Sequence, residues 1–353
     1  MTRLRINFIL PDLFFGGGAR TVLEHAVNLR RFGHNTVVHV PQHSFPDLRH
    51  PVHDLYARVR AYRDRRDFSW YGRDLVRVVP SIDDRFIRDG DIVIATWWKT
   101  AFWVDRLSPS KGIKAHFIQG DERIIDPEAA RAWQLPLAKV TVAHWLQESL
   151  LDLLHVPVYG PVMNAVNRHL FFQTPVTSGR KQTVGVQFST DECKGFGAAR
   201  EAFRIVRKQR PEIQFVAFGQ RLFPRIPPFL RFYYKPRQEE LRTIYSRCAV
   251  WFVPSTNDSM SLIPLEAASC GCALVATETG EMHRYFKDGE SFVQVLGGDP
   301  KGMAIVLLDL LGNRKKREAF ARAAEESAKN VSWERSSRDF ETILFNLHRS
   351  VSV

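Results

Sequence analysis

Residues 249–277 read AVWFVPSTNDSMSLIPLEAASCGCALVAT, and the organisation of the rest of the chain follows from this stretch. The apolar run AVWFV predicts a buried strand, and the polar residues after it predict a turn. A helix is expected from about Leu262 to Cys270–Gly271, and the run ALVAT predicts a second strand. Strand, helix and strand in this order indicate a βαβ unit of a parallel sheet.

Two acids stand out in this unit. Asp258 lies in the turn and Glu266 follows eight residues later, on the helix. Ligands of open parallel sheets bind beyond the carboxyl ends of the strands, so we expect both carboxylates at that rim. Asp258 alone is also typical of an ordinary acid at a helix N-terminus. Glu266 lies in an apolar helix, where an unpaired carboxylate is costly, so it should have a ligand hydroxyl or a buried partner.

The stretch resembles the donor-binding element of retaining glycosyltransferase family 4, whose members have the GT-B fold. The resemblance implies that Glu266 holds the ribose of a nucleotide and that Asp258 contacts the transferred sugar. The sequence departs from the family pattern at Asp258, which replaces a glutamate, and at two turn glycines, which are serines here. The motif comprises Asp258, then Ser259, Met260, Ser261 and Leu262, whose backbone is expected at the sugar, then Leu265-Glu266-Ala267-Ala268 and Cys270-Gly271.

Composition indicates a globular protein with a basic surface. The chain has 353 residues, 44% hydrophobic and 25% charged, which suffices for two domains with sizeable cores. The net charge of +12 favours an acidic partner such as nucleotide phosphates, anionic lipid or nucleic acid. No apolar run approaches the roughly 20 residues of a membrane span, and Pro11 interrupts the first apolar run early. We therefore expect a cytoplasmic protein, with peripheral contact to the inner face of the membrane as an open alternative.

The four cysteines do not predict a metal site. Cys193, Cys248, Cys270 and Cys272 lack the paired CxxC spacing of zinc sites, so buried thiols are expected. The triplet Asp89-Gly90-Asp91 imitates the metal-binding DxD of other transferases. It precedes its predicted strand and so lies at the wrong end of a sheet for a ligand site, which favours a turn.

The chain opens with a second βαβ pattern. Residues 5–11 predict a strand, Gly16-Gly17-Gly18 a loop, residues 19–32 a helix, and NTVVHV after Gly33-His34 another strand, as in a Rossmann-like domain. Glycines before a helix either form a plain turn or let the backbone approach an anion. The resemblance favours Gly17 and Gly18 as contacts of the donor sugar or its phosphates.

The acceptor is expected at the first domain. Residues 58–77 interleave arginines with aromatic residues, which indicates either a solvated face or a surface for a phosphate-bearing lipid, an anionic membrane or DNA. Asp121 and Glu122 follow the predicted strand KAHFIQG and are candidates for a general base on an acceptor hydroxyl. Loop acids are also common surface residues. The family resemblance places acceptor recognition in this half of the chain.

The domain boundary is expected in the polar segment 172–181, which contains Pro175 and Gly179. Asn164-Ala165-Val166-Asn167 and Phe171 resemble the signature that closes the first domain of the family. We therefore expect an N-terminal Rossmann-like domain over residues 1–172 and a C-terminal donor domain over 181–330. The apolar stripe of residues 331–353 predicts a helix that crosses back to the first domain.

The second domain offers a cation for a diphosphate. Lys194-Gly195 opens a predicted helix, where an ammonium and free N–H groups can meet phosphates together. The resemblance favours this role, and it places Gly219 and the turn Tyr234-Lys235-Pro236 beside the nucleotide base. The arginine that the family carries shortly before this lysine is absent. Arg200, Arg221 or Arg225 could supply the second positive charge, or the site is weaker than usual.

The expected fold is therefore α/β, with two facing Rossmann-like domains and a cleft between them. The resemblance implies transfer of a sugar, a hexose or deoxyhexose, from a nucleoside-diphosphate donor to a glycan or lipid-linked acceptor. It implies retention of configuration and no obligatory metal or cofactor. Two alternatives stay open: a transferase that acts on modified DNA bases, and a non-catalytic protein that binds sugar nucleotides or polysaccharide.

Overall fold

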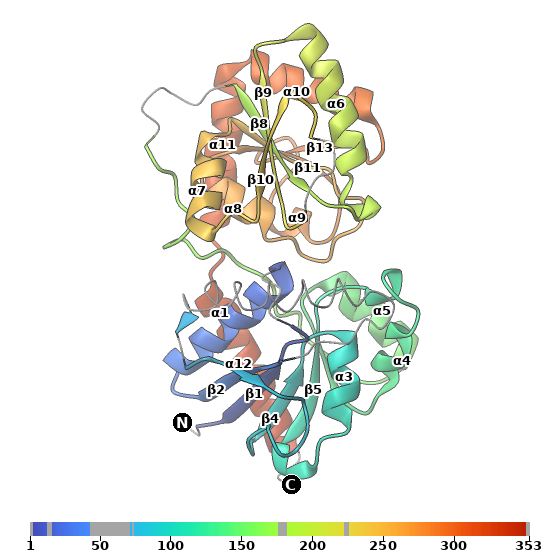
Figure 1. The fold of residues 1–353 in the computed structure, drawn as a ribbon. Coiled ribbons are helices and arrows are strands. Elements are labelled where there is room, and N and C mark those ends of the chain that lie inside the picture. Colours follow the sequence, from blue (N-terminus) through green and yellow to red (C-terminus); the bar gives the residue numbers. More distant parts are fainter. Residues whose placement is uncertain are drawn as a thin grey trace. The chain divides into compact units, whose positions relative to one another are not determined.

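A computed structural model describes residues 3–12, 16–42, 71–72, 74–175, 182–221 and 226–350. The chain divides into two compact units, Met1–Asn164 with Trp333–Val353, and Ala165–Ser332. Each unit is a parallel sheet with helices packed on it (Figure 1). The α/β architecture of two Rossmann-like domains, predicted from the sequence, is confirmed.

The first unit is built on a sheet whose described strands run in the order β3-β2-β1-β4-β5-β6-β7. All described pairings in this sheet are parallel, so the carboxyl ends of the strands meet at one edge. The helices connect successive strands. The elements are β1 (Arg5–Ile9), α1 (Gly17–Arg31), β2 (Asn35–Pro41), β3 (Val76–Val79), β4 (Ile92–Ala95), α3 (Trp98–Asp105), β5 (Ile113–Ile118), α4 (Ala129–Gln134), β6 (Ala138–Thr141), α5 (His144–Leu154) and β7 (Val158–Tyr159), with 3₁₀ turns at Pro109–Lys111 and Glu122–Ile124.

The second unit repeats this plan, with described strands in the order β10-β9-β8-β11-β12-β13. Its central strands are apolar on both faces, as parallel sheets covered by helices require, and every residue of β12 is buried. The elements are β8 (Thr183–Phe188), a 3₁₀ turn (Glu192–Lys194), α6 (Phe196–Gln209), β9 (Gln214–Gly219), β10 (Leu230–Tyr234), α7 (Gln238–Arg247), β11 (Val250–Val253), α8 (Ile263–Ser269), β12 (Ala273–Thr277), α9 (Met282–Tyr285), β13 (Val293–Val295), α10 (Pro300–Gly312) and α11 (Arg314–Lys329).

The boundary between the two units falls earlier in the chain than the sequence predicted. The change falls at Asn164/Ala165, not within 172–181. Val166, Leu170 and Phe171 are the reason, because they are buried in the same apolar cluster as Leu241 and the core of the second unit. A polar composition marks where a chain is exposed, whereas these three side chains determine which core the segment joins.

The last helix, α12 (Trp333–Ser350), belongs to the first unit, as Figure 1 shows for the red helix beside α1. Phe340 stacks on Phe117 of β5 with ring centroids 4.9 Å apart, and it also contacts Phe8 of β1. His25 of α1 lies edge-on to Trp333, with centroids 5.2 Å apart. The apolar stripe of the sequence therefore covers one face of the first sheet, and the predicted return of the final helix is confirmed.

Polar contacts fix the register of α12. The Nε2 of His34 lies 2.7 Å from Oε1 of Glu341. Nδ1 of the same ring accepts the backbone N–H of Leu4 at 3.1 Å, so the imidazole Nε2 carries the proton toward the glutamate. His25 Nδ1 and the Ser337 hydroxyl are 2.9 Å apart in the buried interface. These contacts give His34, Glu341 and Ser337 hydrogen-bond partners where α12 packs on the first unit.

Candidate functional site in the second unit and the rim of the first

The loop that carries Lys194 is fitted against the end of β11. Gly195 has a φ of +68°, and a Cβ atom there would lie 1.9 Å from the carbonyl oxygen of Pro254. Only glycine is compatible with both the conformation and the contact. The backbone N–H of Thr256 also donates to the carbonyl of Cys193 at 2.7 Å. The loops after β8 and β11 are thus joined, and each lies at the carboxyl end of its strand.

Lys194 and Asp258 form an ion pair within these joined loops. The lysine Nζ lies 2.8 Å from Oδ2 of Asp258, while Oδ1 accepts the backbone N–H of Ser259 at 2.9 Å. Burial acts to lower the pKa of Lys194, but the charge and hydrogen bond of Asp258 outweigh it and the pKa is raised. Lys194 is therefore held as an ammonium, and its side chain stays 28% exposed. The two residues that the sequence placed at diphosphate and sugar are in direct contact.

The turn 259–262 continues from this pair into α8. Ser259, Met260 and Leu262 are buried, and Ser261 is half-buried. Gly280, with a φ of +60°, packs so closely on the turn that a Cβ atom would lie 2.5 Å from the carbonyl oxygen of Ser259. The shape of the turn is thus supported from the next loop, after β12. The sequence reasoning did not single out Gly280, although Thr279-Gly280 is a readable turn signal.

Glu266 has a buried protein partner. Only 2% of its surface is exposed, and the hydroxyl of Tyr245 donates to its Oε2 at 3.1 Å. Tyr245 lies on α7 and packs edge-on against Trp251, with ring centroids 4.5 Å apart. Of the two outcomes that the sequence left open for this carboxylate, the structure displays the buried partner. Tyr245 was missed because it looks like one more member of the apolar stripe of its helix.

Gly219 ends β9 and lies against Phe188, the last residue of β8. A Cβ atom on Gly219 would come within 2.9 Å of both the Phe188 ring and the Phe188 carbonyl oxygen. The carbonyl of Gly219 accepts the backbone N–H of Lys235 at 2.9 Å. Gly219 and the turn after β10 are therefore neighbours at the same edge of the sheet as Lys194. Arg200 and Arg221 are among the described residues, and Arg225 lies outside them.

In the first unit, Gly17 and Gly18 begin α1 just beyond the carboxyl end of β1. A Cβ atom on Gly17 would have no atom within 4 Å, whereas one on Gly18 would be 3.4 Å from the Gln119 side chain. Gln119 follows β5 and donates to the carbonyl of Thr96, which follows β4, at 3.3 Å. The two glycines thus lie on the side of the sheet where its strands end, with open space beside Gly17.

Asp121 and Glu122 are neighbours in sequence, but their pKa values are shifted in opposite directions. Arg123 donates to both oxygens of Asp121, at 2.8 and 2.7 Å, and these hydrogen bonds lower the pKa of Asp121. Burial raises the pKa of Glu122 well above its usual value, against the effect of a hydrogen bond from the backbone of Trp98. The ionised form of Asp121 is thus favoured by Arg123, whereas burial favours the protonated form of Glu122.

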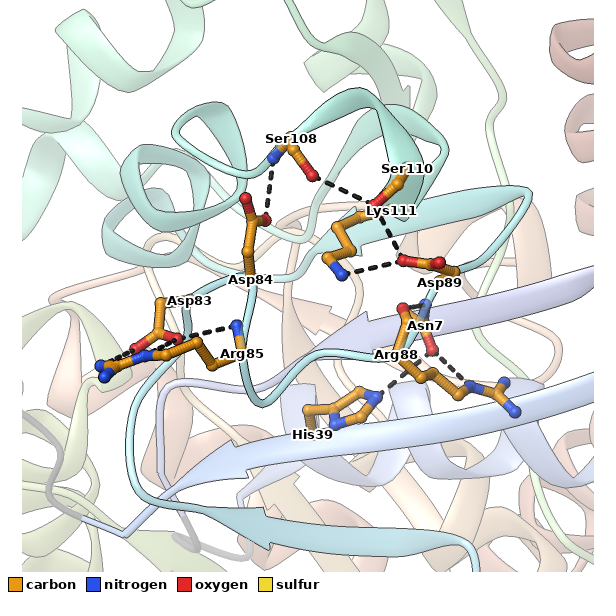
Figure 2. A network of polar contacts seen from close by, with 10 residues as sticks. All are labelled: Asn7, His39, Asp83, Asp84, Arg85, Arg88, Asp89, Ser108, Ser110 and Lys111. Atoms are coloured by element: carbon orange, nitrogen blue, oxygen red, sulfur yellow. Dashed lines mark hydrogen bonds and ion pairs between the residues drawn. The ribbon is translucent and has the colours of Figure 1, made fainter.

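The Asp89-Gly90-Asp91 triplet is held by separate cations at the amino ends of the strands. Asp89 accepts from Lys111 at 2.9 Å and from the Ser110 hydroxyl at 2.8 Å (Figure 2). Asp91 pairs with Arg5 at 3.0 Å. Nearby, Arg88 donates to the Asn7 side chain at 2.8 Å and so ties the loop to β1 (Figure 2). The triplet thus lies in a loop at the amino-terminal ends of the strands, as the sequence predicted.

Three further expectations concern the basic stretch 58–77, a metal site and a membrane span. Most of the basic stretch 58–77 lies outside the described residues, of which 71–72 and 74–77 are the exceptions. Among the described residues, no group of three or more His, Cys, Asp or Glu side chains could hold a metal ion. None of the described helices is both long enough and apolar enough to span a membrane.

The family model for glycosyl transferases group 1 matches residues 183–313. This segment of the second unit is similar to the group 1 glycosyl transferases. The matched segment contains Lys194, Asp258 and Glu266, and the resemblance predicted from the sequence is confirmed. The first unit lies outside the match.

Curated relatives that align with part of this chain are D-inositol 3-phosphate glycosyltransferases. The protein of Corynebacterium urealyticum is 37% identical over 118 residues, which is 33% of this chain and 27% of that protein. The protein of Salinispora tropica is 37% identical over 101 residues, or 29% and 21% of the two chains. The chain thus matches only about a quarter of the length of these relatives.

Solved structures resemble the whole chain at low identity. HepE of Anabaena, in complex with UDP and glucose, superposes with a TM-score of 0.74 at 12% identity and covers 98% of this chain and 100% of its own. Sucrose-phosphate synthase of Thermosynechococcus elongatus has a TM-score of 0.73 at 14% identity, with 99% and 100% coverage. These similarities show that the chain has the GT-B fold.

Proposed function

We propose that the protein is a retaining glycosyltransferase that moves a sugar from a nucleoside-diphosphate sugar to an acceptor hydroxyl. The observation that carries this proposal is the Lys194–Asp258 ion pair, 2.8 Å long, at the carboxyl edge of the family-matched sheet. It combines a permanent ammonium with a carboxylate at the place where open parallel sheets bind ligands. The presence of UDP in the HepE complex makes UDP-sugars the first donors to test.

In this proposal Lys194 receives the diphosphate. A leaving diphosphate gains negative charge in the transition state, and a preorganised ammonium stabilises that charge. The N–H groups at the start of the 14-residue helix α6, directly after Gly195, add to the same field. These groups supply positive charge without a metal, so no obligatory metal is proposed.

Asp258 has two roles in this proposal. It fixes the position and charge of Lys194 before the donor arrives, and it contacts the sugar hydroxyls together with the backbone of residues 259–262. Glu266 holds the ribose hydroxyls, with Tyr245 fixing its carboxylate from behind at 3.1 Å. Gly219 would lie beside the nucleotide base, and Gly17 and Gly18 remain candidates for contacts with the donor.

The acceptor is a glycan or lipid-linked saccharide whose hydroxyl is recognised by the first unit. The side chains proposed for this step are Asp121 and Glu122, which follow β5. Burial raises the pKa of Glu122, so in its protonated form it would orient the acceptor by donating a hydrogen bond. Asp121, held by Arg123, would serve as the proton acceptor or position one.

Donor binding and turnover test the proposal separately. Thermal shift against UDP-, GDP-, dTDP- and ADP-sugars should find one that raises the melting temperature, because a ligand that binds only the folded state stabilises it. Release of free nucleotide should then follow in the presence or absence of EDTA at the same rate. Lys194→Ala should abolish both effects, whereas Lys208→Ala, an exposed lysine at the far end of α6, should leave them intact.

Catalysis would be rejected if a donor binds but neither transfer nor donor hydrolysis occurs with any acceptor, which would indicate a sugar-nucleotide binding protein. Turnover only on duplex DNA with modified bases, at a rate that falls steeply with salt, would instead indicate a base-modifying transferase. An inverted anomeric configuration in the product, measured by NMR, would refute the retaining mechanism.

A further inference from the structure

A basic groove lies on the second unit, at the opposite edge of its sheet from Lys194 and Asp258. Its volume is about 910 Å³, within the range of ligand sites. The groove is lined by the first residues of three strands, Thr183 of β8, Gln214 of β9 and Leu230 of β10. Because these strands are parallel, their amino ends form one edge and the donor-site loops follow the other.

Three exposed arginines give the groove its charge. Arg207 comes from α6, Arg231 from β10 and Arg247 from the end of α7. Within the part of the chain that the structure describes, none of them has a carboxylate at ion-pair distance. The acid of the lining, Glu212, is already paired with Arg210 at 2.5 Å. The groove therefore presents uncompensated positive charge from three separate elements.

Two of the arginines lie on aromatic rings. The guanidinium carbon of Arg207 is 5.3 Å from the ring centroid of Phe229, and that of Arg231 is 4.9 Å from the centroid of Tyr233. A guanidinium over a ring face keeps its N–H edges available for a carboxylate or phosphate. It also covers the ring face on which a nucleobase would stack. The arrangement favours recognition of anionic groups over recognition of bases.

The walls of the groove carry neutral hydrogen-bonding groups as well. Thr174, Thr183 and Thr243 line it together with Gln214. The wall at Thr174 is fixed to α7, because its backbone N–H donates to the Ser246 hydroxyl at 3.3 Å. Hydroxyl and amide side chains beside guanidinium groups are suited to a ligand that has both sugar hydroxyls and acidic groups.

We propose that this groove binds an anionic saccharide, a short glycan segment that carries carboxylate or phosphate groups, independently of the donor site. Arg207, Arg231 and Arg247 contact the acidic groups, and the threonines and Gln214 contact the hydroxyls. The occupied groove would hold a growing or accepting glycan on the surface of the second unit, away from the sugar nucleotide.

Binding of trigalacturonate to the full chain, measured by calorimetry at low ionic strength, tests this inference. We expect binding of trigalacturonate and none of neutral maltotriose. The variant with Arg207→Gln, Arg231→Gln and Arg247→Gln should bind at least about tenfold more weakly, the equivalent of ~1.4 kcal/mol. The control variant with Arg204→Gln and Arg314→Gln removes exposed arginines of α6 and α11 that already have glutamate partners, and it should bind as the unaltered chain does.

The same titrations contain the outcomes that would overturn the proposal. Equal binding of maltotriose, absence of any trigalacturonate binding, or tighter binding of a ten-residue oligothymidylate would each exclude an anionic-saccharide groove. Competition by inorganic phosphate alone at the affinity of trigalacturonate would exclude it as well. The triple variant should keep its thermal shift with the sugar-nucleotide donor, and Lys194→Ala should keep its trigalacturonate binding, so failure of this inference is distinguishable from failure of the proposed transferase activity.

Discussion

Lys194 and Asp258 are 64 residues apart in sequence, and their side chains meet at 2.8 Å. The contact joins the cation that the sequence assigned to the donor diphosphate with the acid that replaces the glutamate of the resembled family. The bridge thus links the departure from the family pattern at Asp258 to the lysine that matches the pattern. A substitution of either residue should therefore also alter the contribution of the other to donor binding.

Asp258→Asn should separate nucleotide binding from turnover. Loss of the carboxylate frees the Lys194 ammonium for phosphate, so UDP affinity should rise by up to about tenfold, ~1.4 kcal/mol. The rate of sugar transfer should fall, because the sugar loses its carboxylate contact. Calorimetry with UDP and a product assay measure the two quantities. If Asp258→Asn weakens UDP binding, the carboxylate does not compete with phosphate for Lys194.

Tyr245→Phe should destabilise the second unit and loosen Glu266. A buried carboxylate that loses a hydrogen-bond donor costs about 1–3 kcal/mol in the free energy of unfolding. Urea unfolding should report this loss, and the KM for the donor should rise more than kcat falls. Tyr159→Phe is the matched control, since that half-buried hydroxyl makes no hydrogen bond to the described residues. Equal stability of both variants would show that the Tyr245 hydroxyl contributes nothing to holding Glu266.

Gly195→Ala and Gly197→Ala should differ sharply although they are two residues apart. Alanine at 195 meets the Pro254 carbonyl and a φ of +68°, so it should cost at least about 1–3 kcal/mol and displace Lys194. Gly197 lies in the first turn of α6, where a Cβ atom would have no atom within 4 Å. Alanine there should be neutral or stabilise by up to about 1 kcal/mol, as expected for an exposed helix position. Thermal unfolding and UDP binding provide the measurements, and a loss of UDP binding in Gly197→Ala would contradict the expectation.

The interface between α1 and α12 should weaken in acid. Burial lowers the pKa of His25 to about 3, whereas an unfolded histidine titrates near 6.5, so the unfolded state binds more protons between these values. Stability from His25 is therefore complete above about pH 6.5 and is lost as pH falls toward 3, by up to ~1.4 kcal/mol per pH unit. Fluorescence of the tryptophans, including Trp333 beside His25, should follow the change.

His25→Phe tests this assignment. The variant should have a flatter dependence of stability on pH between 6.5 and about 3, even if the lost bond to Ser337 lowers its stability at pH 7. His283→Gln, an exposed histidine on α9, should keep the original slope. An unchanged slope in His25→Phe would assign the acid sensitivity to other buried histidines, such as His116, whose pKa is also lowered to about 3.

Local patterns in the sequence predicted the elements around the site well. The helix expected from about Leu262 to residues 270–271 is α8, Ile263–Ser269, and the flanking strands are β11 and β12. Apolar runs predict such elements because a strand or helix can be recognised from the hydrophobic pattern of its own residues alone. The Lys194–Asp258 pair and the Tyr245–Glu266 bond join separate elements, and no period in the sequence encodes which polar side chains will meet. The sequence prediction missed the unit boundary at Asn164/Ala165 for a similar reason. The position of this boundary depends on which core Phe171 enters.

Helix α12 also constrains the order in which the protein can be made. The first unit needs Phe340 and Trp333 against Phe117 and His25, yet the ribosome produces these residues after all of the second unit. During synthesis the part of the first sheet that α12 covers therefore stays exposed, while the continuous segment Ala165–Ser332 can fold at once. A nascent chain arrested before Trp333 should therefore expose apolar surface and require chaperones, and release of the last helix would complete the first unit in a single late step.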